Sequence, residues 1–195
     1  MGLPNATSLL STLPGGLRAT VSRGGVVATL AVRTAIRDSG TLSLGGLECD
    51  VRTAVWVLTA EFPQVRVGDA FTVDRKPAFT VNAMTTCGNL VSRAEVILCE
   101  DSVTVGETAV PCHLGMLAQD VEAGLGGFTP DDLQGFFVPV SAIPSVVGDD
   151  GVAAPVTIAV STQVVISGET MNVVKVARDS KHNILCVTCS RRGDA

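Results

Sequence analysis

Two stretches of the 195-residue chain decide its fold: residues 67–81, VGDAFTVDRKPAFTV, and residues 160–174, VSTQVVISGETMNVV. In each, apolar and polar residues alternate on both sides of a short polar segment, a pattern typical of a β-hairpin. The first stretch is aligned with one additional residue in its turn. The matched apolar positions are then Phe71, Val73, Phe79 and Val81 in the first stretch and, in the same order, Val164, Ile166, Met171 and Val173 in the second.

The agreement between the two stretches continues outside the hairpins. A polar connection and a closing strand follow each hairpin, and a proline-marked turn precedes each one, at residues 62–63 and 143–144. We therefore predict two copies of one small β-barrel module, at residues 26–101 and 108–192. The alternative is that any two hairpins look alike. Residues 1–25 are rich in Gly, Ser and Thr and are predicted to be an extended N-terminal arm.

The rest of the chain also reads as short strands, because β-branched residues are punctuated by Gly, Pro, Asp and Asn. The expected strands are residues 26–32, 54–59, 70–73, 79–83, 93–99, 157–160, 163–166, 171–176 and 184–188. One helix start, Thr129-Pro130-Asp131-Asp132-Leu133, is followed within about two turns by Gly135. The predicted fold class is all-β, with two small β-barrel modules in tandem, an extended N-terminal arm and little helix.

Composition restricts the function classes. Hydrophobic residues make up 46% of the chain and charged residues 17%, so the chain can bury a core. A net charge of −5 argues against a protein that grips phosphates, because nucleic-acid affinity comes mainly from clustered Lys and Arg. A membrane span is not expected, since no run of 18 apolar residues occurs. No basic residue precedes the weakly apolar residues 8–13, so we expect a reducing cytoplasm and six reduced, buried cysteines.

Charge is distributed unevenly along the chain. Residues 1–93 contain nine basic and six acidic side chains, and residues 175–195 contain five basic and two acidic ones. Between them, residues 94–174 contain eleven acidic side chains and no Lys or Arg. An acidic stretch of this length is expected to face a particular partner or ligand.

At residues 65–74 and 79–81, followed by an acidic closing strand, the chain resembles the C-terminal half of the head-closure (stopper) and head-to-tail joining proteins of tailed bacteriophages. Residues 164–176 fit the same pattern and include the turn glycine, Gly168. Proteins of this family are small β-barrels that form a ring between the portal and the tail, retain packaged DNA and present a docking surface for the tail. The resemblance covers about half of the chain. Two departures are the second barrel and a Gly-rich acidic insert at residues 112–151, which has no counterpart in the family.

The resemblance implies a structural virion protein rather than an enzyme, located in the virion after assembly in the host cytoplasm. It would form a ring by self-association, contact portal or adaptor proteins and tail proteins, pass DNA without binding it specifically, and need no cofactor and no membrane. Capsid decoration or tail completion is the alternative within the virion. A cytoplasmic hydrolase that uses Cys112 or Cys87 is the alternative from another class.

Under this hypothesis the hairpin loops are the candidate interface or gating elements, together with the N-terminal arm and residues 124–127 of the insert. A plain solvent-exposed turn is the alternative for each loop. The loop candidates are Asp74, Arg75, Lys76, Pro77, Gly168 and Glu169. Acidic side chains that line the lumen of a ring would repel passing DNA. The lumen candidates are Glu122, Asp131, Asp132, Asp149 and Asp150.

Metal binding and catalysis are less favoured by the sequence. Cys186 and Cys189 form a CxxC pair, but on a strand a spacing of three directs the two side chains to opposite faces, so zinc is not expected. His113 directly follows Cys112, which is a poor geometry for a catalytic dyad. His182 is interpreted as a solvated loop residue. No catalytic, cofactor-binding or metal-binding residue is predicted.

Overall fold

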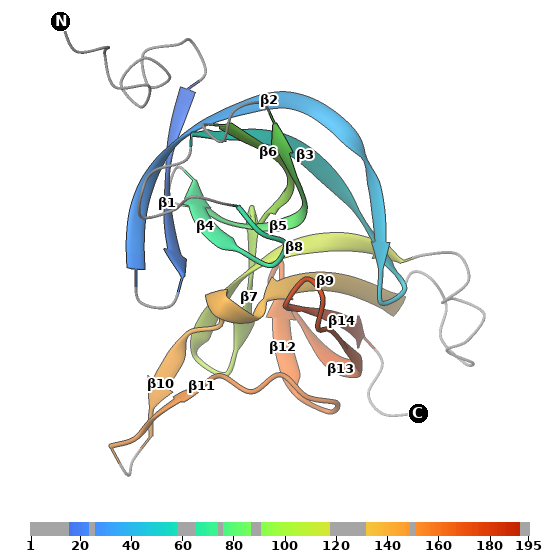
Figure 1. The fold of residues 1–195 in the computed structure, drawn as a ribbon. Coiled ribbons are helices and arrows are strands. Elements are labelled where there is room, and N and C mark those ends of the chain that lie inside the picture. The colour runs from blue at the N-terminus through green and yellow to red at the C-terminus, as the bar shows by residue number, and fades with distance from the viewer. Residues whose placement is uncertain are drawn as a thin grey trace, which may run out of the picture. The chain divides into compact units, whose positions relative to one another are not determined.

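The computed structural model describes residues 16–23, 26–57, 65–73, 76–86, 91–117, 132–148 and 151–191 (Figure 1). These residues are nearly all in β-strands and include no α-helix, which confirms the all-β fold class. The chain divides into two compact units. Unit 1 comprises Met1–Thr41 and Asp50–Leu98, and unit 2 comprises Leu42–Cys49 and Cys99–Ala195.

Unit 2 contains a closed antiparallel barrel of six strands. The strands are β7 (Asp101–Val105), β8 (Thr108–Leu117), β9 (Leu133–Pro139), β12 (Gln163–Ile166), β13 (Glu169–Asp179) and β14 (Ile184–Ser190). They pair in the order β8-β7-β12-β13-β14-β9, and a further pairing of β8 with β9 closes the cycle. Closure leaves the barrel itself without an edge strand, because every backbone ladder has a partner on both sides.

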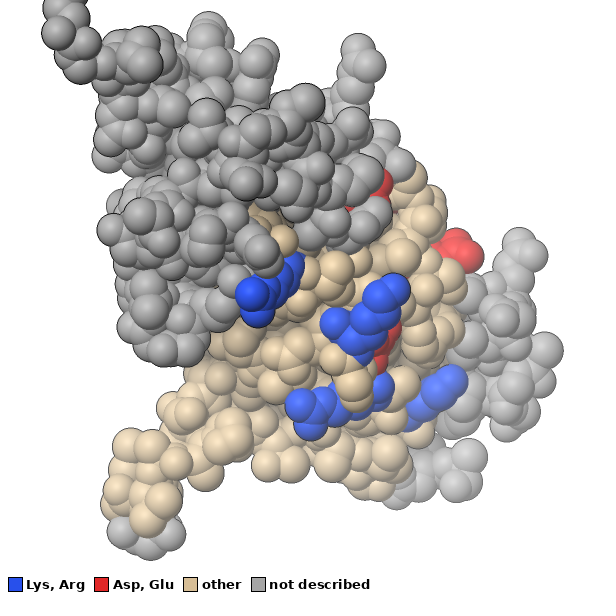
Figure 2. Space-filling model, viewed as in Figure 1, with Lys and Arg blue, Asp and Glu red and all other residues tan. Residues whose placement is uncertain are grey.

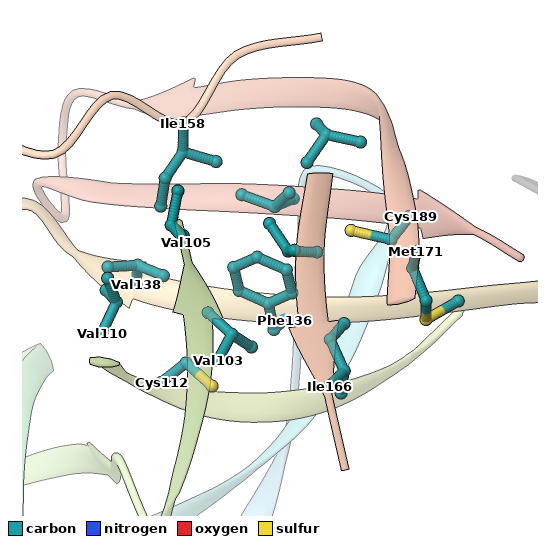
Figure 3. Close-up of a cluster of buried hydrophobic side chains, with 13 residues drawn as sticks. Val103, Val105, Val110, Cys112, Phe136, Val138, Ile158, Ile166, Met171 and Cys189 are labelled. Atoms are coloured by element: carbon teal, nitrogen blue, oxygen red, sulfur yellow. The ribbon is translucent and has the colours of Figure 1, made fainter. Parts of the chain in front are cut away.

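Apolar side chains fill this barrel, as Figure 3 shows. Phe136 of β9 lies among valines, Ile166, Met171 and Cys189 from the surrounding strands. The side chains of β14 alternate between two faces, since Val187 and Cys189 belong to this core while Thr188 between them does not. Alternating apolar residues therefore account for the interior of unit 2.

The outer face of β9 and β14 is covered by the turn between β2 (Val26–Leu44) and β3 (Leu47–Val57). A Cβ at Gly45 would lie 2.6 Å from the Cβ of Cys186, and a Cβ at Gly135 would overlap Cδ2 of Leu47. Gly45 also has a φ of +62°, which L side chains rarely adopt. Glycine at these positions allows residues 42–49 to pack closely on the barrel, and Leu47 is fully buried.

Unit 1 contains β1 (Gly16–Arg23), most of β2 and β3, β4 (Ala70–Val73), β5 (Lys76–Thr86) and β6 (Val91–Leu98). These strands pair in the order β2-β1-β4-β5-β6-β3, and β2 also pairs with β3. The order corresponds strand by strand to that of unit 2 when β1 to β6 are compared with β7, β8, β9, β12, β13 and β14. The two units therefore share one pattern of strand pairing.

The registers of the two hairpins agree residue by residue. Val73 pairs with Lys76 across a two-residue loop, and Ile166 pairs with Glu169 across another. Residue numbers 73 and 166, like 76 and 169, differ by 93. The additional residue assigned to the first turn from the sequence is therefore wrong, and Phe79 corresponds to Asn172 instead of Met171.

The same offset of 93 relates a β-bulge in each unit. The register between β5 and β6 shifts between Thr80 and Asn82, and the register between β13 and β14 shifts between Val173 and Lys175. Because a bulge changes the local direction of a strand, an identical position in both units is a specific shared feature.

A tight turn before each hairpin is shared as well. Gly68 and Ser161, again 93 residues apart, have φ values of +83° and +70°. The side chain of Asp69 accepts a hydrogen bond from the backbone N–H three residues earlier at 2.7 Å, and the hydroxyl of Thr162 does so at 3.1 Å. Asp and Thr thus stabilise the same turn by the same type of contact.

Three local expectations differ from the structure. Residues 16–23 form β1, which pairs with β2 and β4, so the predicted arm over residues 1–25 is not an arm at those positions. Of the predicted helix start at residues 129–133, only Asp132 and Leu133 are described. Asp132 has 3₁₀ geometry and Leu133 already begins β9, so no helix continues towards Gly135. A strand forms at Ala153–Pro155 and not at residues 157–160.

Candidate interaction surface

A small two-stranded arm projects from the barrel of unit 2 (Figure 1). It consists of β10 (Ser145–Val147) and β11 (Ala153–Pro155), which pair antiparallel. Beyond the strands, the N–H of Gly148 donates to the carbonyl oxygen of Val152 at 3.0 Å, and the N–H of Gly151 donates to that of Gly148 at 2.9 Å. Two glycines therefore terminate the ladder where the chain reverses.

The base of the arm is attached to the barrel core. Ile143 and Val156 pack against the buried cluster of unit 2, and the N–H of Val156 donates to the carbonyl oxygen of Pro144 at 3.0 Å. A short 3₁₀ turn, Val140–Ala142, precedes the arm, and the N–H of Val140 donates to the carbonyl oxygen of Asn183 at 3.0 Å. The arm is thus held at its base by both packing and backbone hydrogen bonds.

The projecting part of the arm is apolar and exposed. All six residues of β10 and β11 are exposed, and Val146, Val147 and Val152 have exposed fractions of 45%, 65% and 60%. Figure 2 shows the described part of the arm without Lys, Arg, Asp or Glu, whereas basic side chains lie elsewhere on the same view. Exposed apolar strands that carry no charged side chain are typical of a protein-interaction surface.

Both faces of the arm share this character. Val146 lies opposite Ala154, and Val147 opposite Ala153. Because successive side chains of a strand point to opposite faces, the first pair lies on one face and the second pair on the other. Neither strand therefore shows the alternation of apolar and polar residues that is typical of a sheet with one solvated face.

The two edges of the arm differ. Hydrogen-bonded pairs alternate along an antiparallel ladder, and the bond between Gly148 and Val152 fixes that alternation. The N–H and C=O groups of Ser145 and Val147 consequently point away from β11. On the other edge, Pro155 has no N–H to offer. The β10 edge is therefore open to a further strand, while the β11 edge is partly blocked.

The loop residues selected from the sequence are placed differently. Asp74 and Arg75 lie outside the described residues; Lys76 and Pro77 begin β5, where Pro77 pairs with Thr72. In the second hairpin only residues 167–168 form the turn, and Gly168 has a φ of +87° with open space around it. Glu169 is already part of β13, and its carboxylate lies 2.7 Å from Nε of Arg191 at the surface.

Of the five acids proposed to line a lumen, only one lies among the described residues. Asp132 is half-buried, and its carbonyl oxygen accepts a hydrogen bond from the N–H of Arg191 at 2.9 Å. Glu122, Asp131, Asp149 and Asp150 lie outside the described residues, as do residues 124–127. Arg191 thus links a basic flank of the sequence to the acidic stretch within one unit.

The described cysteines are buried. Cys189 faces the barrel core and Cys186 faces the turn at Gly45, so the expected placement on opposite faces of a strand is confirmed. Burial raises the pKa of the Cys112, Cys186 and Cys189 thiols to about 12, and nearby Asp101 and Asp179 contribute at Cys112 and Cys186, respectively. Such thiols are protonated near neutral pH, which argues against Cys112 as a nucleophile. Cys87 lies outside the described residues.

His182 is not a solvated loop residue, as the sequence suggested. It is only 6% exposed, and its Nδ1 lies 2.8 Å from Oδ2 of Asp179. The other carboxylate oxygen of Asp179 accepts hydrogen bonds from the N–H groups of Lys181 and His182 at 2.9 and 3.1 Å. The Asp179 side chain therefore stabilises the turn between β13 and β14, and its hydrogen bond holds the imidazole of His182 in a buried position.

Other sites receive little support within the described ranges. No three His, Cys, Asp or Glu residues of those ranges converge as a metal site would require, and His113 instead lies 6.3 Å from the ring of Phe137. The described residues contain no apolar helix of membrane-spanning length. Comparisons with family models, with curated proteins and with solved structures find no match.

Proposed function

We propose that this chain is a structural protein of a tailed-bacteriophage particle, which self-associates as a ring at the head-to-tail connection and docks to neighbouring proteins. The arm carries this proposal, because the six residues of β10 and β11 are exposed and include no charged side chain. Its exposed valines would be buried only by a partner, and its base is fixed in the barrel core. A rigid barrel with a projecting apolar arm suits assembly better than it suits turnover of a small molecule.

The repeated pattern of strand pairing supports the same proposal. Two units with matching hairpins, bulges and lead-in turns are best explained by a tandem duplication of one barrel module. Two modules in one chain offer a structural protein two docking surfaces from a single fold. The proposed position in the particle rests on the resemblance of residues 65–74 and 164–176 to head-closure and joining proteins.

The acidic stretch at residues 94–174 has a role in this proposal. In a ring around DNA, acidic side chains on the lumen would keep the passing duplex from binding through like-charge repulsion. Basic flanks would then pair with acidic neighbours, as Arg191 does with Glu169 within unit 2. Acids found on the outer rim of an assembled ring would remove this part of the proposal.

Electron microscopy of particles that carry this chain, labelled with a chain-specific antibody, tests the position. Label at a single vertex supports the head-to-tail connection. Label spread over the shell would instead make the chain a decoration protein, and label at the distal end of the tail would make it a tail protein. Absence of the chain from purified particles would contradict a virion role.

A further inference from the structure

We propose that the open edge of β10 binds residues 1–15 of a second copy of this chain as an added strand. The inference rests on the proposed self-association and names the two parts of the chain that would form the contact between copies. Ser145 and Val147 offer outward backbone N–H and C=O groups, and an extended segment can pair with them as a third strand of the arm. The added strand would also cover Val146 and Val147, which are otherwise exposed.

The charge of the chain identifies residues 1–15 as the occupant. A segment laid against uncharged valines should itself carry no charge, because desolvating a charge without a partner is costly. Three segments longer than four residues lie outside the described ranges: residues 1–15, 58–64 and 118–131. The second contains Glu61, and the third contains Asp120, Glu122 and Asp131, whereas the first charged residue of the chain is Arg18. Residues 1–15 are thus the only segment of the three without a charged side chain.

The composition of this segment suits the arm. Pro4 and Pro14 bracket residues 5–13, NATSLLSTL, and proline restricts strand pairing at its own position. The bracketed residues are longer than the three-residue strand β10. Leucines occur at both odd and even positions, so both faces of an added strand would be partly apolar, like both faces of the arm.

The pairing would produce a directional assembly. Because the donated segment and the receiving edge are different parts of the chain, each copy gives one strand and receives one, and such head-to-tail contacts close as rings or extend as filaments. Fifteen extended residues span about 50 Å, which is enough to reach a neighbouring subunit. Pro155 on the other edge disfavours addition of a fourth strand, so the sheet would end at three.

Site-specific photocrosslinking of the full chain tests the contact. A benzophenone side chain at position 147 is introduced into a mixture of ¹⁴N- and ¹⁵N-labelled chains, and crosslinked peptides are identified by mass spectrometry. We expect links from position 147 to residues 1–15 that join light to heavy chains. The control is position 153, which lies opposite 147 on the same face but on the blocked edge, and should not yield these links.

Crosslinks that join only chains of one label would overturn the inference, because the segment would then bind within its own chain. Crosslinks between position 147 and β10 of a second copy would also overturn it, by showing that two edges meet each other. Crosslinks to any other segment would assign a different occupant to the edge and refute the proposal in the same way.

Native mass spectrometry with Val147→Lys separates this inference from the proposed function. Val147 is 65% exposed, so the variant should keep the wild-type circular dichroism spectrum while its mass falls to that of the 20.0-kDa monomer. Ala153→Lys should retain the wild-type mass, and excess synthetic peptide of residues 1–15 should reduce it. If wild type assembles and neither Val147→Lys nor the peptide has an effect, the contact is wrong while self-association stands. A monomeric wild type contradicts both.

Discussion

Replacing Thr80 with valine is expected to stabilise unit 1, and the reciprocal change in unit 2 to destabilise it. The Thr80 side chain is fully buried in β5, and its hydroxyl has no hydrogen-bond partner. The position related by the 93-residue offset is Val173, which is buried in the core of unit 2. The two units thus differ at this position by a buried hydroxyl without a hydrogen-bond partner, and unit 2 supplies the apolar replacement.

The expected magnitude follows from the cost of the unpaired hydroxyl. Leaving a buried donor or acceptor without a partner costs about 1–3 kcal/mol. Thr80→Val removes that group and replaces it with a methyl of nearly the same size, so the free energy of unfolding should rise by about 1 kcal/mol. Val173→Thr introduces an unpaired hydroxyl among apolar side chains, so it should lower that free energy by about 1–3 kcal/mol.

Guanidinium unfolding measures both changes. The single tryptophan of the chain, Trp56, lies in unit 1, so its fluorescence follows the transition that Thr80→Val affects. Far-UV circular dichroism follows Val173→Thr because unit 2 contains no tryptophan. A stabilisation of 1 kcal/mol moves the midpoint by about 0.3 M. A lower midpoint for Thr80→Val would refute the reasoning, since it would show that the hydroxyl contributes a favourable interaction.

Three further predictions concern the packing, pH dependence and thiols of unit 2. Gly45→Ala should lower the free energy of unfolding, measured by calorimetry, by more than about 2 kcal/mol, because its Cβ would overlap Cys186. Gly168→Ala should lower it by about 1 kcal/mol, through its positive φ alone. Equal losses would contradict the close approach of Gly45 to Cys186. Burial raises the pKa of Asp179, but hydrogen bonds from His182 and Lys181 lower it by more, so its net pKa lies below the usual value. The stabilising effect of the Asp179 carboxylate is therefore complete above the unfolded pKa of about 3.9 and is lost as pH falls through the folded pKa. In urea unfolding, the free energy of unfolding of Asp179→Asn should fall less steeply at acid pH than that of the wild type. An equally steep fall would exclude this role. Buried Cys112, Cys186 and Cys189 should remain unlabelled by iodoacetamide in the native chain and react after denaturation, so native labelling at these sites would show that they are accessible.

The sequence predicted the hairpins well because period-two alternation and turn residues are local signals. Strands β4 and β12 have the residue bounds that were expected, Ala70–Val73 and Gln163–Ile166. The alignment of the two hairpins past the turn failed because it matched large apolar residues. In the backbone register, the position in unit 2 that is equivalent to Phe79 is Asn172. Side-chain type alone does not record the register, and the pairing of Val73 with Lys76 and of Ile166 with Glu169 shows that both turns have the same length.

The arm was missed for a different physical reason. The arm spans residues 145–155, SVVGDDGVAAP, and the predicted acidic, Gly-rich insert at residues 112–151 ended inside it. A two-stranded ribbon with apolar residues on both faces has no alternation that would reveal it. The sequence did contain a hairpin signal, since two valines are followed by a short segment that begins and ends with glycine. Exposure of Val146 and Val147 depends on tertiary packing, which the local pattern does not specify.

Residues 42–49 show the same limit for domain assignment. The first module predicted from the sequence, residues 26–101, includes them, yet they pack on the barrel of unit 2. That contact depends on the absence of side chains at Gly45 and Gly135, two positions 90 residues apart in the chain. Glycine has many structural uses, so its presence alone does not predict such a distant contact.

Self-association of this chain is tested most directly by sedimentation equilibrium of the purified full-length protein, followed by electron microscopy of the same sample. A structural ring protein predicts a molar mass that is a multiple of 20.0 kDa and annular particles in the images. A single 20.0-kDa species at every concentration, with no annular particles, would contradict the proposed role in assembly.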